Sequence, residues 1–261
     1  MSAAVDLPGL VAALGLPEGA AVGRRIPKKL LLDTAAATAA DKRAITDGID
    51  ELHWLAALKP GTVGIPAYHD ELREYLEIAI LSIALRPEAS AGRIAELVHR
   101  AIPYPVLLIA HSGAGIGLSL AHKRWSHNET GKTVLDGELL EAPLQSAGPP
   151  DLIAQFVDAL SLEKQPRLSL HALYQGWMDG VIALQTAFVT GVFAVSSSRE
   201  HAAARHQALR EVKKLRAEIA RLKALAVKEK QMARQVELNL EIKRLESEET
   251  HHLGLLRTEK A

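Results

Sequence analysis

Apolar side chains in the first half of this chain of 261 residues recur with two different periods. A spacing of three or four positions, typical of amphipathic helices, occurs over 6–16, 38–50 and 90–102. Pro17 follows the first of these segments and would end it, and Thr38 is placed to cap the second. The pattern therefore predicts three short helices.

Runs of Leu, Ile, Val and aromatic residues at strand-like lengths alternate with these helices, separated by proline and glycine. They occupy 51–66, 74–86, 104–125 and 132–144. Both alternating faces of the second run are mostly apolar, which favours a central strand over an edge strand. The third run predicts a hairpin with Ser112 to Gly115 near its tip. The order of elements predicts a small α/β or α+β domain over about 25–144.

The second half of the chain has a helical pattern throughout. Residues 145–151, Gln-Ser-Ala-Gly-Pro-Pro-Asp, form turns readily and mark the clearest domain boundary. Helices are predicted beyond it over 152–162 and 167–195. The second is strongly apolar, but Asp179 and Gln185 interrupt it, so we expect a buried helix and no membrane span.

The longest predicted element is a single helix over 199–249, which contains neither proline nor glycine. At a rise of about 1.5 Å per residue it would reach about 75 Å. Its apolar residues follow the 3-4 spacing of a coiled-coil seam up to Ala226, and the phase then shifts. The stripe that follows runs either through Met232, Val236 and Leu240 or through Leu238, Ile242 and Leu245.

A stripe on so long a helix needs another helix to cover it, so the seam predicts assembly with a partner helix. The predicted assembly seam comprises Val212, Leu215, Ile219, Leu222, Met232 and Val236. The resulting architecture is an N-terminal α/β (α+β) domain with a small sheet, a helical connector and a long C-terminal α-helix or coiled coil. The predicted divisions are 1–22 for an N-terminal helix, 23–146 for the α/β domain, 147–197 for the connector and 198–261 for the coiled-coil arm.

The amino-acid composition excludes several kinds of functional site. The chain has no cysteine, which excludes disulfides, thiolate metal sites, iron–sulfur clusters and cysteine nucleophiles, and suits a reducing cytoplasm. The 31 basic and 31 acidic residues balance, so overall charge does not point to nucleic acid or to a membrane. The first residues carry no basic segment before an apolar one, so we expect no signal peptide and a cytoplasmic protein.

Short matches to catalytic motifs do not extend to the whole motif. Gly131-Lys-Thr resembles the end of a phosphate-binding loop, but Ser126 stands where that loop needs glycine. The glycines from Gly113 to Gly117 lack the spacing of a dinucleotide-binding turn, and Ser112 lacks the glycine elbow of serine hydrolases. The histidines have no metal-ligand spacing. We therefore predict no catalytic residue, no metal and no cofactor.

The distribution of charge along the C-terminal arm fits two interpretations of its surface. Between Arg199 and Val236 there are 11 Lys or Arg against 4 Glu, and between Glu237 and Ala261 there are 4 against 6, so the arm is expected to be basic near its root and acidic towards its tip. Such a face is typical of a solvated coiled coil or of a contact with nucleic acid. Further candidates for a basic contact surface are Arg24, Arg25, Lys28, Lys123 and Arg124.

A metal-dependent nuclease is a further alternative function. The acids near Glu77 (Asp70, Glu71 and Glu74) could act with Lys123, but the acid that should precede such a lysine is missing. Incubation with duplex DNA and Mg²⁺ or Mn²⁺ would distinguish a nuclease from a binding protein.

Several stretches resemble one bacterial family, the domain of unknown function numbered 4391. They are Gly23–Leu31, Leu52–Pro66, Glu77–Arg86, Arg100–Arg124 and Glu229–Glu248, so the resemblance covers about 23–249. The most specific part is a tail motif that includes Glu229, Lys230, Gln231, Glu237, Leu238 and Asn239. Met232 and Leu81 stand where the family often has an aromatic residue, and both changes keep the position apolar.

The resemblance implies no established catalytic residue. It implies an accessory role, because such proteins are found beside helicases and DNA methyltransferases in restriction or phage-defence loci. The leading hypothesis is therefore a non-enzymatic adaptor of a bacterial DNA-targeting system. Its arm is expected to pair with itself or with a helicase- or methyltransferase-type protein, nucleic acid is a possible further partner, and no membrane is involved.

Overall fold

The computed structural model describes residues 5–126, 129, 131–144, 149–196 and 198–257. The chain divides into two compact units, Met1–Val181 and Ile182–Ala261. The four divisions predicted from the sequence stay predictions, and 145–148 of the expected boundary lie outside the described residues. Among the helices of the described residues, none combines the length and the apolar character that crossing a membrane requires.

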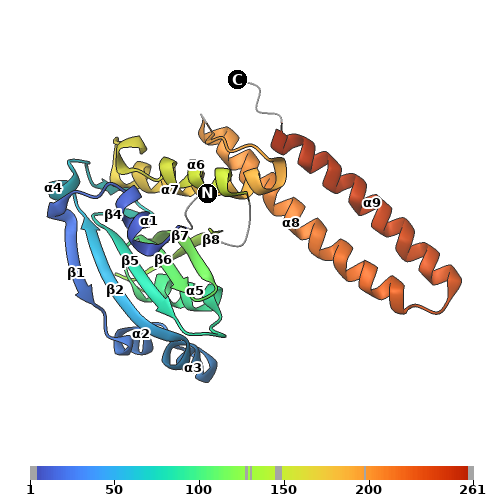
Figure 1. Ribbon diagram of the computed structural model, residues 1–261, viewed down its shortest axis with the longest axis horizontal. Helices are drawn as coiled ribbons and strands as arrows, with labels where there is room; N and C mark the ends of the chain where they lie inside the picture. Colours follow the sequence, from blue (N-terminus) through green and yellow to red (C-terminus); the bar gives the residue numbers. More distant parts are fainter. Residues whose placement is uncertain (1–4, 127–128, 130, 145–148, 197, 258–261) are drawn as a thin grey trace. The chain divides into compact units, whose positions relative to one another are not determined.

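Within the described part of the first unit, six strands form a mixed sheet in the order β1-β2-β5-β6-β7-β8 (Figure 1). They are β1 (Ala21–Arg25), β2 (Ile49–Leu58), β5 (Ile78–Leu85), β6 (Val106–Ser112), β7 (Gly115–Trp125) and β8 (Thr133–Pro143). Neighbouring strands are antiparallel except β5 and β6, which are parallel because α5 (Ala91–Ala101) crosses over between them. A separate two-stranded ribbon pairs β3 (Tyr68–His69) with β4 (Glu74–Tyr75).

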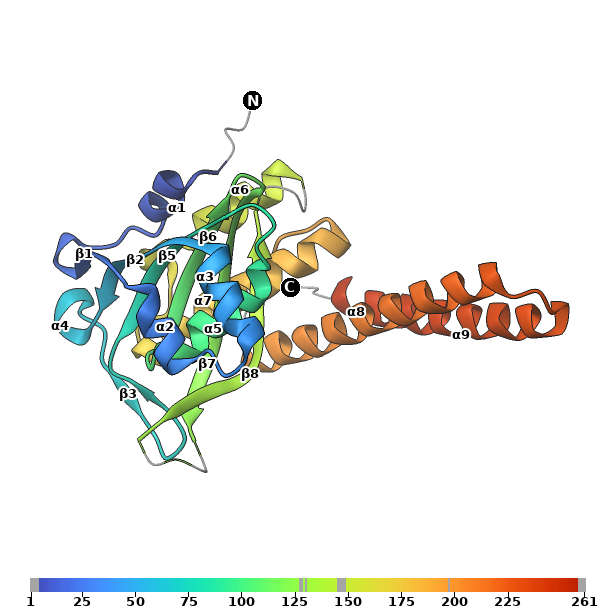
Figure 2. The same ribbon diagram turned by 90° about the horizontal axis from the view of Figure 1, so that it is seen from below.

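Helices cover both faces of this sheet (Figures 1 and 2). On one face lie α2 (Lys28–Thr34), α3 (Ala39–Gly48) and α5; on the other lie α1 (Leu7–Ala13), α6 (Pro150–Ala159) and the first half of α7 (Leu170–Thr190). The short elements are η1 (Glu18–Ala20), α4 (Pro60–Val63) and η2 (Leu162–Lys164). Tyr174 of α7 joins its helix to the sheet, since its hydroxyl donates to the Val106 carbonyl at 2.6 Å and accepts from the Ala121 amide at 3.0 Å.

The predicted α/β fold class is confirmed, and several of its local features are too. Strand β5 is buried on both faces over its first six residues, as a central strand should be. The hairpin of β6 and β7 closes with Ser112 opposite Gly115. Thr38 caps α3, because its hydroxyl accepts from the Asp41 amide at 3.1 Å while the Asp41 carboxylate accepts from the Thr38 amide at 3.2 Å.

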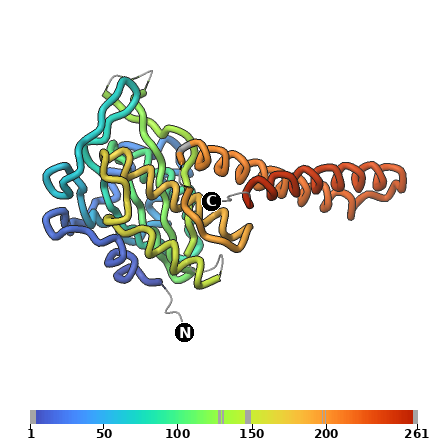
Figure 3. The backbone as a smooth tube through the Cα atoms, turned by 90° about the horizontal axis from the view of Figure 1, so that it is seen from above, coloured from blue at the N-terminus to red at the C-terminus, as the bar shows by residue number. Residues whose placement is uncertain are grey.

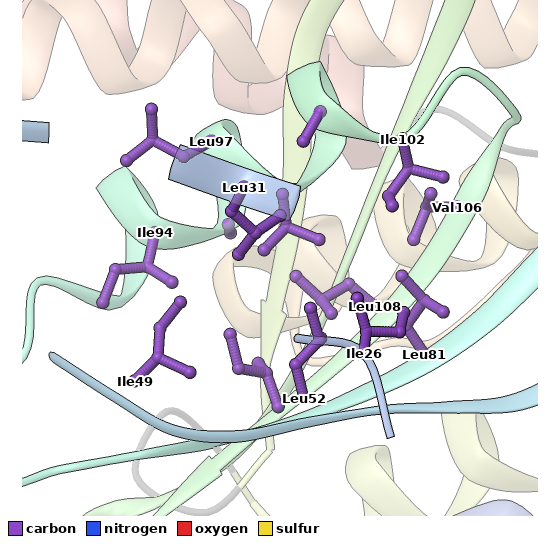
Figure 4. Close-up of a cluster of buried hydrophobic side chains, with 14 of the residues drawn as sticks. Ile26, Leu31, Ile49, Leu52, Leu81, Ile94, Leu97, Ile102, Val106 and Leu108 are labelled. Carbon is purple, nitrogen blue, oxygen red and sulfur yellow. The ribbon is translucent and has the colours of Figure 1, made fainter. Parts of the chain in front are cut away.

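One core of the first unit fills the space between the sheet and the layer of α2, α3 and α5 (Figure 4). Alternate residues of the strands and one face of α5 meet there, which is why both periods appear in the sequence. Its fully buried members include Leu31, Ile45, Ile49, Leu81, Leu97, Val106 and Leu108. Full burial of one such side chain contributes about 1.5–3 kcal/mol, so this layer contributes a large part of the unit's stability.

The second unit contains the end of α7 and two long helices, α8 (Arg199–Lys228) and α9 (Met232–Arg257). The two helices run antiparallel, side by side, and form a hairpin (Figures 1 and 3). The single continuous helix predicted over 199–249 is therefore wrong, because the chain reverses after Lys228. Ser198 begins α8, and its hydroxyl accepts from the His201 amide at 3.2 Å.

Candidate functional site

The first part of the predicted assembly seam lies inside the hairpin. Val212, Leu215, Ile219 and Leu222 are between 1% and 9% exposed. Ile242, Leu245 and Leu256 of α9 pack against them, with Val189 of α7 at one end. The helix that must cover this stripe is thus supplied by the same chain, and a role of these four residues in joining separate chains stays a prediction.

Opposite charges of the two helices meet across the hairpin. Arg216 contacts Glu249 at 2.7 Å, and Lys223 contacts Glu246 at 2.8 Å. The expected arrangement of a basic root and an acidic tip is therefore wrong, since the acidic segment returns alongside the basic one. Exposed pairs of this kind contribute roughly 0–1 kcal/mol each, so their main effect is on the register of the two helices.

The turn between the helices is formed by the start of the tail motif. The Glu229 carboxylate accepts from the backbone amides of Lys230 and Gln231, both at 2.8 Å, and Arg234 lies 3.7 Å from its second oxygen. The amide of Gln231 is the main reason why the pKa of Glu229 is lowered. On the far side of the turn, Gln235 donates to the Ala226 carbonyl at 3.3 Å. The turn is thus stabilised by a side-chain carboxylate, whereas most turns contain glycine or proline.

The rest of the tail motif belongs to α9. Leu238 is partly buried and packs with Ile242 and Leu245 against α8, whereas Glu237 and Asn239 are exposed. Of the two stripes that the sequence left open, the one through Leu238, Ile242 and Leu245 therefore fills the hairpin.

The other stripe is exposed. Met232, Val236 and Leu240 are 76%, 51% and 63% exposed, and their spacing of four residues places them on one face of α9. We call these three residues the tip ridge, because they begin at the turn. Val227 and Leu225, at the end of α8, are also exposed. Large apolar residues grouped in this way are typical of interaction surfaces.

Lys123, one of the five residues predicted to form a basic surface, is buried. It is 2% exposed, and its ammonium group donates to the carbonyls of His99 and Ile102 at the end of α5. Its inclusion in a contact surface was wrong, because the positive charge serves the carbonyl end of a helix. Burial lowers the pKa of Lys123 to about 8. Lys28 acts similarly at the end of α3, donating to the carbonyls of Thr46 and Ile49.

The three arginines of that set are closer to the solvent. Arg25 lies 3.4 Å from Glu51, and Arg124 lies 3.8 Å from Asp136, which also binds Arg73 at 2.6 Å. Arg24 is exposed and has no ion-pair partner among the described residues. Their role in binding another molecule stays a prediction.

The residues of the nuclease alternative have other contacts. Glu77 is buried and pairs with Lys59 at 3.0 Å, and Asp70 accepts from the amides of Leu72 and Arg73 in the turn between β3 and β4. Within the described residues, no three His, Asp or Glu side chains are grouped as a metal site would need. The sequence Gly131-Lys-Thr leads into β8 and not into a helix; residues 127, 128 and 130 lie outside the described part.

A chain of polar side chains that the sequence did not predict links β4, β7 and α7. The Tyr75 hydroxyl hydrogen-bonds to Nδ1 of His122, whose Nε2 lies 2.7 Å from Oε1 of Gln175. Gln175 in turn donates to Asp179 at 2.8 Å, and His171 stacks on His122 with ring centroids 5.2 Å apart. Burial raises the pKa of Tyr75, so its hydroxyl keeps its proton. These residues come from distant parts of the sequence, which is why no local pattern indicated them.

Comparison with known proteins gives a family and no closer relative. No curated protein and no solved structure matches the chain. One family model, described as Domain of unknown function (DUF4391), matches residues 14–248. This range includes the whole sheet, α8 and the tail motif at the turn. The chain therefore belongs to the DUF4391 family.

Proposed function

We propose that this protein is a non-enzymatic accessory protein, an adaptor, of a bacterial DNA-targeting system of the restriction or phage-defence type, acting in the cytoplasm. In this proposal the α8–α9 hairpin is the assembly device, and the tip ridge is its contact surface. The observation that carries the adaptor role is the exposure of Met232, Val236 and Leu240 on a helix whose other apolar stripe is already covered, whereas the DNA-targeting context rests on the family resemblance.

The tip ridge is not needed to hold the hairpin together. Ile242 and Leu245 are each 6% exposed and fill the hairpin with Leu215, Ile219 and Leu222. Polar residues at the ridge positions would leave that packing unchanged and would be better solvated. Burial of exposed apolar surface against another chain is favourable at about 25 cal/mol per Å² of area, so the ridge favours association.

A second copy of the chain fits the ridge best. Met232 lies four residues before Val236, and Leu240 lies four residues after it. Two α9 helices packed antiparallel about Val236 would therefore place Met232 of one copy against Leu240 of the other, as a self-complementary two-fold contact requires.

The test is the mass of the protein in solution as a function of concentration. A ridge of three residues is a small interface, so we expect a dimer with a dissociation constant on the order of 10–100 µM. Val236→Glu places two carboxylates at the two-fold centre and should give a monomer by sedimentation equilibrium. Leu168→Glu is the matched control, since Leu168 is 84% exposed and belongs to the first unit. It should leave the dimer intact.

Two results would contradict the second-copy contact. One is a wild type that stays monomeric at millimolar concentration, and the other is a dimer that Val236→Glu leaves unchanged. With a monomeric wild type, the adaptor role is tested against the purified products of the neighbouring genes. Binding that Val236→Glu abolishes and Leu168→Glu does not would support a different protein partner at the same ridge.

Contact with nucleic acid is the second candidate, because α8 carries nine Lys or Arg and three Glu. Several of these cations already face carboxylates, among them Arg216, Lys223 and Arg221, which lies 2.6 Å from Glu218. Phosphates would have to displace these pairs. Binding of duplex DNA or RNA that weakens steeply with salt would support this candidate, because phosphate contacts release counterions.

A further inference from the structure

The first unit contains a cavity of about 340 Å³ where the carboxyl ends of β5 and β6 meet the N-terminal half of α5. These two strands are the one parallel pair among the described strands, and α5 connects them. Ligands of α/β sheets bind outside the carboxyl ends of such strands. The volume lies within the range of roughly 300–1,000 Å³ that small-molecule sites occupy. Position and size therefore agree with a ligand site.

Small side chains keep this cavity open. Its walls include alanine and glycine residues of α5, β6 and β7, namely Ala91, Gly92, Ala95, Ala110, Gly115 and Gly117. At Gly117 the neighbouring strand enforces the small size, because a Cβ there would lie 3.2 Å from the Ala142 carbonyl oxygen. Walls of this kind offer a ligand apolar contacts and few polar ones, so the body of the ligand is compact and apolar.

The deep end of the cavity carries one hydroxyl group. Gly115, Gly117 and Ser119 follow one another on the same face of β7, so Ser119 lies furthest from the hairpin tip. Ser119 is buried, and its hydroxyl oxygen lies 3.0 Å from Nε2 of His99, which is buried as well. The direction of this hydrogen bond decides what the hydroxyl can offer to a ligand.

The imidazole of His99 donates in this hydrogen bond. Burial, and then the nearby charge of Lys123, lowers the pKa of His99 to about 3, so the ring is neutral and carries one proton. Nδ1 has no hydrogen-bond partner among the described residues. A proton on Nδ1 would leave a buried N–H without an acceptor, which is rarer in proteins than an acceptor without a donor. The proton therefore belongs on Nε2, which donates it to the Ser119 oxygen.

The hydrogen of the Ser119 hydroxyl is then available to an acceptor. Among the described residues, the contact with His99 is the one hydrogen bond that this hydroxyl forms. An acceptor atom of a ligand, such as a carbonyl oxygen, would complete it. The same direction excludes a nucleophilic role, because the histidine of a catalytic triad accepts the proton of its serine.

An ionised group at the deep end would be unfavourable. It would lose its hydration without meeting an opposite charge there. Glu141, the carboxylate among the described lining residues, is exposed at the rim. The ammonium group of Lys123 binds the carbonyls of His99 and Ile102, at the other end of α5, and does not line the cavity.

We infer that the cavity binds a small uncharged organic molecule, with a carbonyl-type oxygen that accepts from Ser119 and a compact apolar body against the alanine and glycine walls. This binding function goes beyond the adaptor proposal and does not depend on it, since every described residue that lines the cavity belongs to the first unit.

Four probes with one bicyclic body test this inference: indanone, indane, aminoindane and indane carboxylate. Binding to the full-length protein is followed at pH 7 by shifts of backbone amide signals in NMR spectra. We expect indanone to shift the signals of Ala95, Ala110 and Ser119, with a dissociation constant on the order of 1 mM. The protonated amine and the carboxylate should bind more weakly than the ketone, because their charge has to leave water.

Ser119→Ala separates the hydrogen bond from the apolar contacts. It should weaken the binding of indanone about threefold to tenfold and leave that of indane unchanged, because indane has no acceptor. Ser82→Ala is the matched control, since Ser82 is also a buried serine of a central strand but alternates with Leu81 and Ile83, which face the α5 side. It should change the affinity of neither probe.

The tautomer of His99 is a second measurement, independent of any ligand. Nitrogen NMR signals of the imidazole should show the proton on Nε2 and none on Nδ1. The inference is wrong if the proton is on Nδ1 or if either ion binds as tightly as indanone. It is equally wrong if Ser119→Ala leaves the affinity for indanone unchanged, or if no probe shifts the cavity signals.

Discussion

The two units of this protein bury their apolar residues in different ways. In the first, helices cover both faces of a six-stranded sheet within the described residues, and side chains such as Leu97 are wholly buried. In the second, two helices cover one stripe of each other, and Ile219 at the centre is 6% exposed. A two-helix hairpin has no third layer, so half of each helix stays in water.

This difference shows where an exposed apolar residue indicates an interaction surface. An exposed apolar residue on the first unit, such as Leu168, stands among surface residues of a domain whose core is complete. The tip ridge lies instead on a hairpin of two helices, on the outer face of α9, where the packing of the hairpin does not require apolar residues. One truncation in each unit tests whether the two units differ in stability as their packing implies. A pH dependence of stability then tests the first unit alone.

The largest effect is expected for Leu97→Ala in the first unit. Removing a fully buried leucine from a layer packed on several sides costs about 2–5 kcal/mol, through lost burial and the cavity left behind. Urea denaturation followed by tryptophan fluorescence measures this loss, because Trp54, Trp125 and Trp177 all belong to the first unit. A loss below 1 kcal/mol would mean that this layer contributes little to the stability of the unit.

A smaller and local effect is expected for Ile219→Ala in the second unit. The truncation should cost about 2 kcal/mol, at the low end for buried isoleucine, because solvent is close on both sides. Hydrogen exchange of the amides of α8 and α9 should speed up, while that of β5 and β6 stays unchanged. Val227→Ala, at a position 84% exposed, is the control and should change neither. Faster exchange in both units would show that they unfold together.

The smallest effect, when taken over a single pH unit, is a pH dependence of stability that belongs to the first unit. The pKa of Lys123 is about 8 in the folded protein and about 10.4 in an unfolded chain, so the unfolded state binds more protons between these values. The free energy of unfolding should therefore rise with pH from about 8 to about 10, by at most about 1.4 kcal/mol per pH unit. Above pH 10 the buried tyrosines oppose this rise, because burial raises the pKa of Tyr75 and of Tyr174.

Lys123→Met is the matched variant, since it keeps the length of the side chain and removes the charge. Its free energy of unfolding should lose the rise between pH 8 and 10 that the wild type shows. An equal slope in both proteins would assign the effect to another group. Unfolding is followed by urea titration at each pH, in the same ionic strength.

The local pattern of the sequence was sufficient where a structure depends on neighbouring residues. The cap at Thr38, the hairpin closed by Ser112 and Gly115 and the buried strand β5 all follow from a few adjacent positions. It was not sufficient at the turn after Lys228. That turn contains neither glycine nor proline and depends on the Glu229 carboxylate, so the shift in the apolar phase was its one signal.

Features that join distant residues could not be predicted from local pattern. In the sequence, Lys123 is part of a short basic run in β7. Its ammonium group contacts the end of α5 only in the folded protein. The polar chain of Tyr75, His122 and Gln175 joins residues of β4, β7 and α7, and none of the three indicates this arrangement by itself. The family tail motif was recognised as a pattern, whereas its role as a turn required the geometry.

The glycine-free, proline-free turn also has a consequence for how copies of this chain can exchange parts. Nothing in the backbone of residues 229–231 forbids a helical conformation there. If the Glu229 contacts broke, α8 and α9 could join into one rod, and its seam would then be covered by α9 of another molecule through the same contacts. Closed and domain-swapped forms would share nearly every interaction, so protein concentration and this one carboxylate would decide between them.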